Sequence, residues 1–313
     1  MRIGIDAMGG DFAPKPAVLG AIAASIELQN LGTVVLYGDS SKIEPILKEH
    51  NCNTANIDVF HTSETIAMGD HPAKAFQHKQ DSSITVGFKH LQSRKIDAFC
   101  SAGNTGAMMI GSMHTIKAIP GIIRPCLASP IPKISGKTTG TLLDVGLNSD
   151  CKPDVLYQYG ILGNIYAKTY YDIETPNICL LNIGEEEEKG NLLTKATYEL
   201  MKDGIHFKFG GNIESNNLFT DKADVVVCDG FTGNIILKQI ESFYSIAHEL
   251  HLSHPYIENL NYENHGGTPV LGVNAPIVVG HGASNEIAIK NMILQAYRIT
   301  IIKLPEKIKQ ALQ

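Results

Sequence analysis

The sequence predicts a three-layer α/β/α protein built on a mostly parallel sheet. Short apolar runs alternate with longer segments of helical periodicity along most of the 313 residues. The apolar runs are nearly continuous, which indicates strands that are buried on both faces. An alternation of such strands with helices is typical of a parallel sheet covered by helices on each side.

The predicted elements follow one another in a regular order. A strand in MRIGIDA (1–7) precedes a helix from Pro16 to Leu28, whose apolar residues form one stripe. Further strands are expected in 33–39, 56–61, 96–103, 138–146, 177–184, 223–230 and 275–282, and further helices over 41–50, 152–171, 191–203, 233–251 and 284–302. The segment 124–146 departs from this order and predicts an antiparallel hairpin around Ser135–Gly136. No linker or repeat is evident, so a single domain over 1–313 is predicted.

Charge and hydropathy exclude several classes of protein. The formal charge is −6, with 26 basic and 32 acidic residues, whereas a nucleic-acid-binding protein usually has a basic surplus. Asp6 and Asp11 interrupt the first apolar run, which therefore does not read as a secretory signal. No run approaches the roughly 18 apolar residues of a membrane span. We therefore expect a cytoplasmic protein.

The six cysteines are scattered, at positions 52, 100, 126, 151, 179 and 228, without any CxxC spacing. Neither a zinc knuckle nor a redox pair is expected. Cys100, Cys126, Cys179 and Cys228 lie in or beside apolar runs and are predicted to be reduced residues of the core.

Small polar residues gather at the ends of the predicted strands. Six strands end in GD (38–39), SAGNTG (101–106), DVGLN (144–148), NIGEEEEKG (182–190), CDGFTGN (228–234) and GHGASN (280–285). In open α/β sheets, ligands bind outside the carboxyl ends of the strands. We therefore expect these loops to share one cleft. The alternative is that each glycine only makes a turn.

The loop SAGNTG has the composition of an anion site. A helix is predicted to begin near Asn104 or Thr105, so its first amides have no partner within the helix, and the helix dipole adds partial positive charge. Gly103 and Gly106 would let an anion approach the backbone, which suits phosphate. DGFTGN (229–234) repeats this design, and GHGASN resembles it. The alternative for each loop is a helix cap that holds no ligand.

Charged candidates are few. In GEEEEKGN, Lys189 could neutralise phosphate while Glu185 or Glu186 holds it in place. The alternative is a solvated run of charge. His281 stands between two glycines and could donate a hydrogen bond to an oxyanion, or it could be structural.

Several familiar catalytic motifs are incomplete. ISGKTTG ends like a P-loop, but Ile131 occupies the place of its first glycine. No GxGxxG follows the first strand, Leu252 breaks the HExxH pattern in HELHLSH, and no GxSxG occurs. These gaps argue against a P-loop kinase, a standard nicotinamide dehydrogenase, a zincin protease and an ordinary serine hydrolase.

Eight longer segments follow one another along nearly the whole chain. They are IGIDAMGGDFAPKPAVLGA (3–21), SAGNTGAMM (101–109), RPCLASPIP (124–132), LLDVGLNSDCKPDVLYQYG (142–160), LLNIGEEEEKGN (180–191), GGNIES (210–215), ADVVVCDGFTGNIILK (223–238) and GGTPVLGVNAPIVVGHGASN (266–285). Together and in this order, they resemble the PlsX family, the phosphate acyltransferases of bacterial phospholipid synthesis.

The resemblance implies a reaction and a fold. The reaction is transfer of a long-chain acyl group from acyl-(acyl carrier protein) to inorganic phosphate, which gives acyl phosphate and free carrier protein. The fold would be similar to phosphate acetyltransferases and isopropylmalate dehydrogenases, in a homodimer without organic cofactor or essential metal. The product would feed the membrane acyltransferase that acylates glycerol 3-phosphate. A cytoplasmic enzyme is implied, with peripheral association at the inner face of the membrane left open.

The predicted site combines the strand-end loops with the resemblance. Its catalytic candidates are Lys189, His281 and Asn104. Its substrate-binding candidates are Asp6, Gly9, Gly10, Asp11, Ser101, Gly103, Thr105, Gly106, Asp144, Asn148, Lys152, Glu185, Glu186, Asp229, Thr232, Gly233, Asn234 and Ser284. No metal site is predicted.

One segment departs from the family pattern. Family members commonly have a longer helical hairpin after the DGFTGN helix, linked to dimerisation and to contact with membrane or carrier protein. Here the segment is only 239–265, with apolar residues at helical spacing and no basic cluster. A short dimerisation or docking segment is predicted, the alternative being an ordinary amphipathic helix. Direct membrane contact is not expected.

The mechanism predicted is direct attack of phosphate on the thioester in a ternary complex. Amides around Gly103–Gly106 and Thr232–Asn234, with Lys189, would hold phosphate, and His281 or Asn104 would donate to the oxyanion. Three other classes stay open: a short-chain, coenzyme A-dependent phosphate acyltransferase, a dehydrogenase of the isopropylmalate type, and a non-catalytic carrier-binding module. Within the acyltransferase reading, a ping-pong route would use Cys228 as nucleophile.

Overall fold

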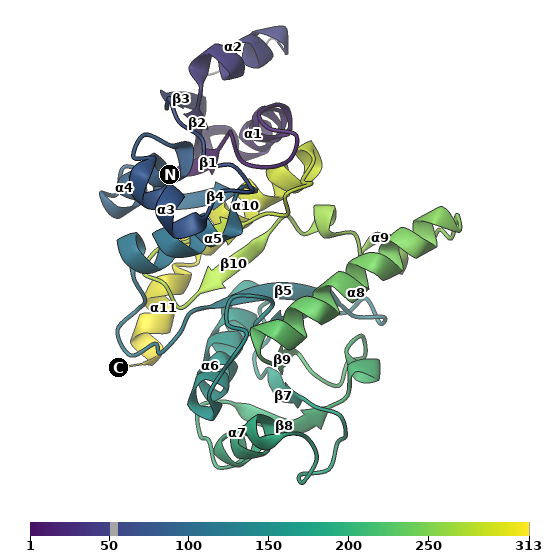
Figure 1. Cartoon of the computed structure of the whole chain (residues 1–313). Helices are drawn as coiled ribbons and strands as arrows, with labels where there is room; N and C mark the ends of the chain where they lie inside the picture. The colour runs from purple at the N-terminus through teal and green to yellow at the C-terminus, as the bar shows by residue number, and fades with distance from the viewer. Residues whose placement is uncertain (51–55, 313) are drawn as a thin grey trace. The chain divides into compact units, whose positions relative to one another are not determined.

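The computed structural model describes residues 1–50 and 56–312, which form two compact units (Figure 1). Unit 1 comprises Met1–Ala118 and Tyr262–Pro305, and unit 2 comprises Ile119–Asn261 and Glu306–Gln313. Each unit is described by itself below. The prediction of a single domain over 1–313 stays a prediction.

Unit 1 is built on a mostly parallel sheet with the strand order β3-β2-β1-β4-β11-β10. The strands are β1 (Arg2–Asp6), β2 (Thr33–Gly38), β3 (Ile57–His61), β4 (Ala98–Ser101), β10 (Thr268–Leu271) and β11 (Ile277–Val279). The neighbours from β3 to β11 run parallel, and β10 pairs antiparallel with β11. The carboxyl ends of β1, β4 and β11 therefore meet at one edge.

Helices cover both faces of the unit 1 sheet. They are α1 (Lys15–Leu28), α2 (Ser40–Glu49), α3 (Pro72–His78), α4 (Ser83–Gln92), α5 (Thr105–Ile110) and α10 (Glu286–Ile301), with short turns η1 (Gln29–Leu31), η3 (Gly111–Ile116) and η5 (Tyr262–Asn264). On β4, the Phe99 ring lies against Gly87 of α4, whereas the Cys100 thiol lies 3.9 Å from the Met292 carbonyl of α10. Successive strand residues point to opposite faces, so α4 and α10 lie on opposite sides of the sheet.

Unit 2 has its own sheet, with the strand order β5-β6-β9-β7-β8. The strands are β5 (Cys126–Pro132), β6 (Thr139–Leu143), β7 (Asn177–Leu181), β8 (Lys208–Ile213) and β9 (Val225–Val227). β5 and β6 form the antiparallel hairpin that the sequence predicts, while β6, β9, β7 and β8 run parallel. The carboxyl ends of β6, β9 and β7 therefore share one edge of this unit.

The helices of unit 2 pack closely on this sheet. They are α6 (Pro153–Tyr170), α7 (Leu192–Lys202), α8 (Gly230–Glu249) and α9 (Pro255–Glu258), with the turn η4 (Ser215–Asn217); α11 (Leu304–Ala311) lies mostly in this unit. Gly163 of α6 lets the side chains of Leu143 and Val225 come against the helix, because a Cβ there would lie within 2.6 Å of both. α8 packs on β5 and β6.

A buried lysine ties the hairpin of unit 2 to a neighbouring loop. Lys133 is 2 % exposed, and its Nζ donates to the Leu218 carbonyl oxygen at 3.0 Å. Burial lowers the pKa of Lys133. Ser135 Oγ continues the connection by donating to the Asp221 carboxylate at 2.7 Å. Together these contacts fix the turn that joins β5 to β6.

The predicted fold class is confirmed, and so are most of the predicted elements. α8 begins three residues before the expected Gly233, because Asp229 caps the helix by accepting from the Thr232 amide. Six elements were not predicted from the sequence, and they are short or interrupted by glycine: α3, α4, α9, α11, β8 and β10. The four predicted core cysteines are buried, and Cys52 lies outside the described residues.

We expect Gly233→Ala to destabilise the protein, because an added Cβ would lie 1.8 Å from the Asp144 carbonyl oxygen. Overpacking of this kind costs about 1–3 kcal/mol or more, which thermal unfolding would detect as a lower Tm. Gly69→Ala is the matched control, since nothing lies within 4 Å of its Cβ position. An unchanged Tm for Gly233→Ala would show that this close contact between helix and loop is not rigid.

Candidate functional site

Three loops of unit 1 meet at the carboxyl ends of β1, β4 and β11. The Asp11 amide donates to the Gly282 carbonyl oxygen at 2.7 Å, and the Gly280 amide donates to the Ser101 carbonyl oxygen at 2.8 Å. The structure therefore brings together the predicted residues of the first strand end, SAGNTG and GHGASN. The edge they form is called the glycine edge below.

Asp6 connects two loops of the glycine edge through hydrogen bonds to its buried carboxylate. It is 1 % exposed, and its carboxylate accepts from Ser101 Oγ at 2.7 Å and from the Met8 amide at 3.0 Å. Burial raises the pKa of Asp6, and these hydrogen bonds act in the opposite direction. Ser101 Oγ in turn accepts from the Gly103 amide at 2.9 Å. Asp6 and Ser101 therefore support the loops, and their use in binding substrate stays a prediction.

The glycines of this edge are required by the close approach of two loops. A Cβ on Gly9 would lie 2.7 Å from the Gly103 nitrogen, and Gly10 has a φ of +110°, which favours glycine. Main-chain atoms therefore line this part of the edge. Such a main-chain lining is compatible with a binding role for Gly9, Gly10 and Gly103, which stays a prediction.

Asn104 caps α5 and anchors a neighbouring loop. Its Oδ1 accepts from the Ala107 amide at 2.9 Å, and its Nδ2 lies within 3.2 Å of the carbonyl oxygens of Ala67, Met68 and Asp70. The side-chain amide is thus occupied by internal hydrogen bonds, and its role as an oxyanion donor stays a prediction. By contrast, no hydrogen-bond acceptor for the amides of Thr105 and Gly106 is found within the described residues.

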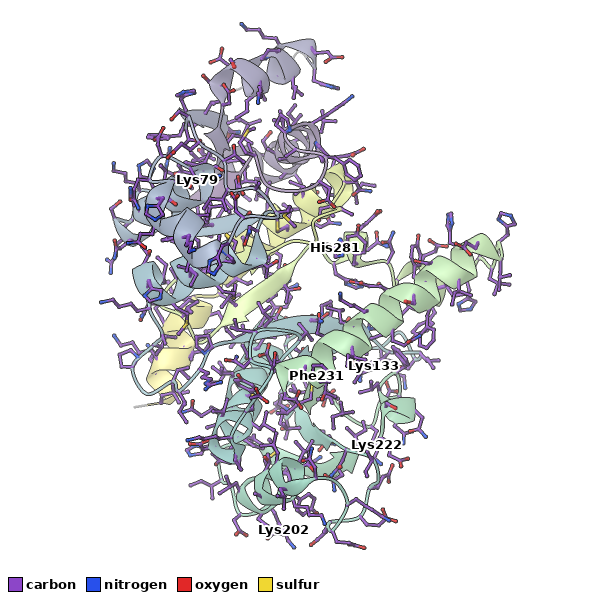
Figure 2. All side chains as sticks on the ribbon, viewed as in Figure 1. Lys79, Lys133, Lys202, Lys222, Phe231 and His281 are labelled. Atoms are coloured by element: carbon purple, nitrogen blue, oxygen red, sulfur yellow. The ribbon has the colours of Figure 1, made fainter. Side chains whose placement is uncertain are left out.

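His281 is the exposed side-chain donor of the glycine edge, on the loop between β11 and α10 (Figure 2). Its Nδ1 accepts from the Ala283 amide at 3.2 Å. The neutral ring therefore carries its proton on Nε2, which is left as a donor. The Tyr262 ring lies 5.1 Å away, centroid to centroid. Ser284 is buried and its Oγ donates to the His281 carbonyl oxygen at 2.6 Å, so it shapes the turn instead of facing a substrate.

In unit 2, a second buried aspartate organises the strand-end loops. Asp144 is fully buried, and its carboxylate accepts from the amides of Leu127, Gly146, Leu147 and Asn148 and from Asn148 Nδ2, at 2.8–3.3 Å. Burial raises the pKa of Asp144, while the hydrogen bonds act against this rise. Asn148 Nδ2 also lies 2.7 Å from the Tyr159 hydroxyl. Asp144 and Asn148 therefore hold the strand-end loops in place, and their use in binding stays a prediction.

The amides at the start of α8 are already occupied. The Thr232 amide donates to Asp229 Oδ1 at 2.9 Å, and the Gly233 amide donates to the Asp229 carbonyl oxygen at 3.0 Å. The first two amides of the predicted phosphate site at Thr232–Asn234 therefore have internal acceptors, and that site stays a prediction. The Asn234 side chain, near Gly146, has no hydrogen-bond partner within the described residues and stays a candidate.

The charged candidates of unit 2 are exposed. Glu185 is ion-paired with Lys222 and accepts a hydrogen bond from Asn217 Nδ2 at 3.1 Å. Its carboxylate is therefore not paired with the Lys189 ammonium group. Lys189 is exposed on the loop after β7, and within the described residues its ammonium group has no ion-pair partner. Glu186 and Lys152 are also exposed. These three residues stay candidates.

Cys228 is poorly suited to be a nucleophile. It is 3 % exposed, and its thiol contacts the Asp144 carbonyl oxygen at 3.6 Å. Burial raises the pKa of Cys228 well above its ordinary value. Because the thiolate is the reactive form, this environment argues against the ping-pong alternative.

A cavity of about 380 Å³ lies elsewhere in unit 1, lined by Arg2, Val35, Tyr37, Phe60, His90 and Lys95. None of the predicted site residues lines it. Its polar groups are largely paired, since Arg2 binds Asp58 at 2.7 Å and the Tyr37 hydroxyl lies 2.9 Å from His90 Nδ1. In the part of the chain that the structure describes, no group of three or more potential metal ligands is found, and no helix is long and apolar enough to cross a membrane.

A family model described as "Fatty acid synthesis protein" matches residues 1–255. A phosphate acyltransferase from Dictyoglomus turgidum is 39% identical to the chain, in an alignment that covers 100% of this chain and 98% of the relative. A phosphate acyltransferase from Thermoanaerobacterium thermosaccharolyticum is 40% identical, with 100% of this chain and 97% of the relative covered.

The chain belongs to the phosphate acyltransferase family. This finding confirms the resemblance predicted from the eight segments, and the chain is accordingly an acyltransferase of fatty acid and lipid synthesis. Solved structures show the same fold at low identity. A phosphotransacetylase from Streptococcus pyogenes gives a TM-score of 0.65 at 16% identity, covering 96% of this chain and 94% of that one. A 4-hydroxythreonine-4-phosphate dehydrogenase from Klebsiella pneumoniae gives a TM-score of 0.53 at 12% identity, covering 96% of this chain and 98% of that one.

The sequence analysis missed the loop that covers the start of α5. Residues 66–71 approach Asn104, and Pro72 lies against Gly106, where a Cβ would be 2.3 Å from the proline ring. The only signal in the sequence is the run GDHPAK, a turn followed by a helix start with proline at its first position. Nothing in that run indicates a partner 34 residues further along the chain.

Proposed function

We propose that this enzyme transfers a long-chain acyl group from acyl-(acyl carrier protein) to inorganic phosphate. The observation that carries the proposal is the glycine edge of unit 1. It combines main-chain atoms around Gly9 and Gly103, amides of Thr105 and Gly106 without an internal acceptor, and the donor His281. Main-chain amides bind phosphate without a charged side chain. Family membership supports the same reaction.

The proposed reaction needs positioning more than base catalysis, because phosphate is already an anion at neutral pH. A phosphate oxygen attacks the thioester carbonyl carbon, and the resulting oxyanion accepts a hydrogen bond from His281 Nε2. The C–S bond then breaks, the acyl phosphate forms, and the carrier thiolate leaves and takes a proton from water. Holding both reactants supplies several of the roughly 7–11 kcal/mol available to ideal orientation. One oxyanion donor adds about 3 kcal/mol.

Trapping of the product with hydroxylamine tests the reaction. With hexadecanoyl-(acyl carrier protein), we expect acyl hydroxamate to form rapidly only when phosphate is present, because acyl phosphate reacts with hydroxylamine. Equal trapping without phosphate, or an acylated enzyme isolated after mixing with the acyl carrier protein alone, would contradict direct attack. Turnover of acetyl-coenzyme A in preference to the carrier substrate would favour the short-chain alternative.

Two side-chain deletions test the proposed donors. We expect His281→Ala to lower kcat by roughly 100-fold while leaving the KM for phosphate nearly unchanged, since the oxyanion exists only in the transition state. Lys189 lies in unit 2, and its neutralisation of phosphate is a separate proposal, under which Lys189→Ala loses most activity. Steady-state kinetics with circular dichroism checks both, and Lys195→Ala on the exposed side of α7 is the control. Near-normal turnover would reject the role proposed for the residue concerned.

We also propose that the enzyme is a homodimer that uses α8. Phe231, Ile235, Phe243, Ile246 and Leu250 are 47–63 % exposed along this helix. Phe243, Ile246 and Leu250 recur at helical spacing and form an exposed apolar stripe, whose burial against a partner is favourable. The helix has no basic cluster, so a second copy of the chain suits the stripe better than an anionic membrane surface. The enzyme is proposed to act in the cytoplasm and to supply acyl phosphate to the membrane glycerol-3-phosphate acyltransferase.

Replacing the stripe tests the dimer. We expect Phe243→Ser with Ile246→Ser to shift the mass measured by light scattering from dimer to monomer, because burial of both side chains is lost. Glu241→Ser with Gln239→Ser changes polar residues of the same helix and should leave the mass unchanged. A dimer that persists in the first double variant would place its interface elsewhere.

A further inference from the structure

Two large apolar side chains are exposed beside the glycine edge. Phe12 is 64 % exposed and Met68 is 48 % exposed. Isolated exposed apolar residues are common, but Met68 reaches the glycine edge and Phe12 is the chain neighbour of a residue of that edge. The terminal methyl of Met68 lies 3.1 Å from where a Cβ on Gly282 would be. Phe12 follows Asp11, whose amide donates to the Gly282 carbonyl oxygen.

The loop that carries Met68 is held firmly on the edge. Asn104 donates to the carbonyl oxygens of Ala67, Met68 and Asp70 at 3.0–3.2 Å. Asp70 accepts from the Ala67 amide at 2.8 Å and from Lys79 Nζ at 2.6 Å (Lys79 is labelled in Figure 2). Met68 is therefore presented to solvent by a loop that is held in place, so its side chain is available to contact a ligand at this edge.

The surroundings of Met68 divide into a polar and an apolar part. His281 is adjacent to Gly282 in the chain and offers its Nε2 donor, while the glycine main chain offers polar atoms. Phe12 and Met68 contribute apolar surface without hydrogen-bonding groups. A thioester needs both kinds of contact, because its carbonyl is polar and its acyl chain is not.

We infer that Met68 and Phe12 contact the apolar chain of the acyl donor and thereby set its preferred length. This inference rests on the proposed function and adds to it the residues that recognise the donor. Phe12 and Met68 offer carbon surface and no hydrogen-bonding group, so they favour a long apolar chain over a short one.

The test compares kcat/KM for hexadecanoyl- and hexanoyl-(acyl carrier protein) in Met68→Ser, Phe12→Ser and the double variant. We expect each single change to lower the ratio of long-chain to short-chain kcat/KM by about tenfold, as for loss of a few methylene contacts. The KM for phosphate should not change. Because both side chains are exposed, the variants should unfold at the wild-type Tm.

Ile205→Ser is the matched control, since Ile205 is 92 % exposed in unit 2. A ratio in the double variant equal to that of wild type and control would overturn the inference. Equal losses for both donors would also overturn it, because they would indicate a general effect on activity. Absence of acyl phosphate from the wild-type enzyme would instead reject the proposed function, so the two failures are distinguishable.

Discussion

A buried aspartate at the end of an interior strand is the interaction on which each unit's loops depend. Asp6 closes β1 and Asp144 follows β6, and each carboxylate accepts several hydrogen bonds that would otherwise need water. A buried carboxylate is costly unless its lone pairs are satisfied. The loops around each aspartate are therefore held in the one arrangement that supplies those donors, and the glycines allow the loops to come that close.

This constraint explains why several polar residues turn away from solvent. Ser101, Asn104, Asn148 and Asp229 each hydrogen-bond to neighbouring main chain or side chains. Their chemical type suits a substrate as well as it suits a cap or a turn, and the internal use is the one observed. Main chain is left to face a ligand at the glycine edge, together with the exposed side chains of Thr105 and His281. An acyl transfer to phosphate can work with so few side chains, because the nucleophile is supplied already ionised and the thiolate leaves readily.

The apolar side chains beside the glycine edge provide what the acyl chain of the proposed substrate needs. Phosphate and the thioester carbonyl need donors, whereas a long acyl chain needs contact with carbon. Met68 reaches the edge through a loop that Asn104 anchors, so a residue that supplies no free donor still contributes to the arrangement of the site. The α8 stripe is a separate apolar feature in unit 2, and we assign it to the dimer.

Sequence alone determined the fold class, most strands and helices, the buried cysteines and the family. These properties follow from apolar periodicity and from long motifs in order, which are local or nearly local signals. It also located the strand-end loops on which we propose the site, since strand ends can be located from composition. Only the tertiary structure decided which side chains are free. Asn104 is the clearest case: its amide binds three carbonyls of a loop more than 30 residues earlier, and no local pattern predicts a hydrogen bond made across such a distance in the chain. Likewise, only the folded chain placed Met68 against Gly282, because side-chain neighbours are set by how elements pack and not by their order in the sequence.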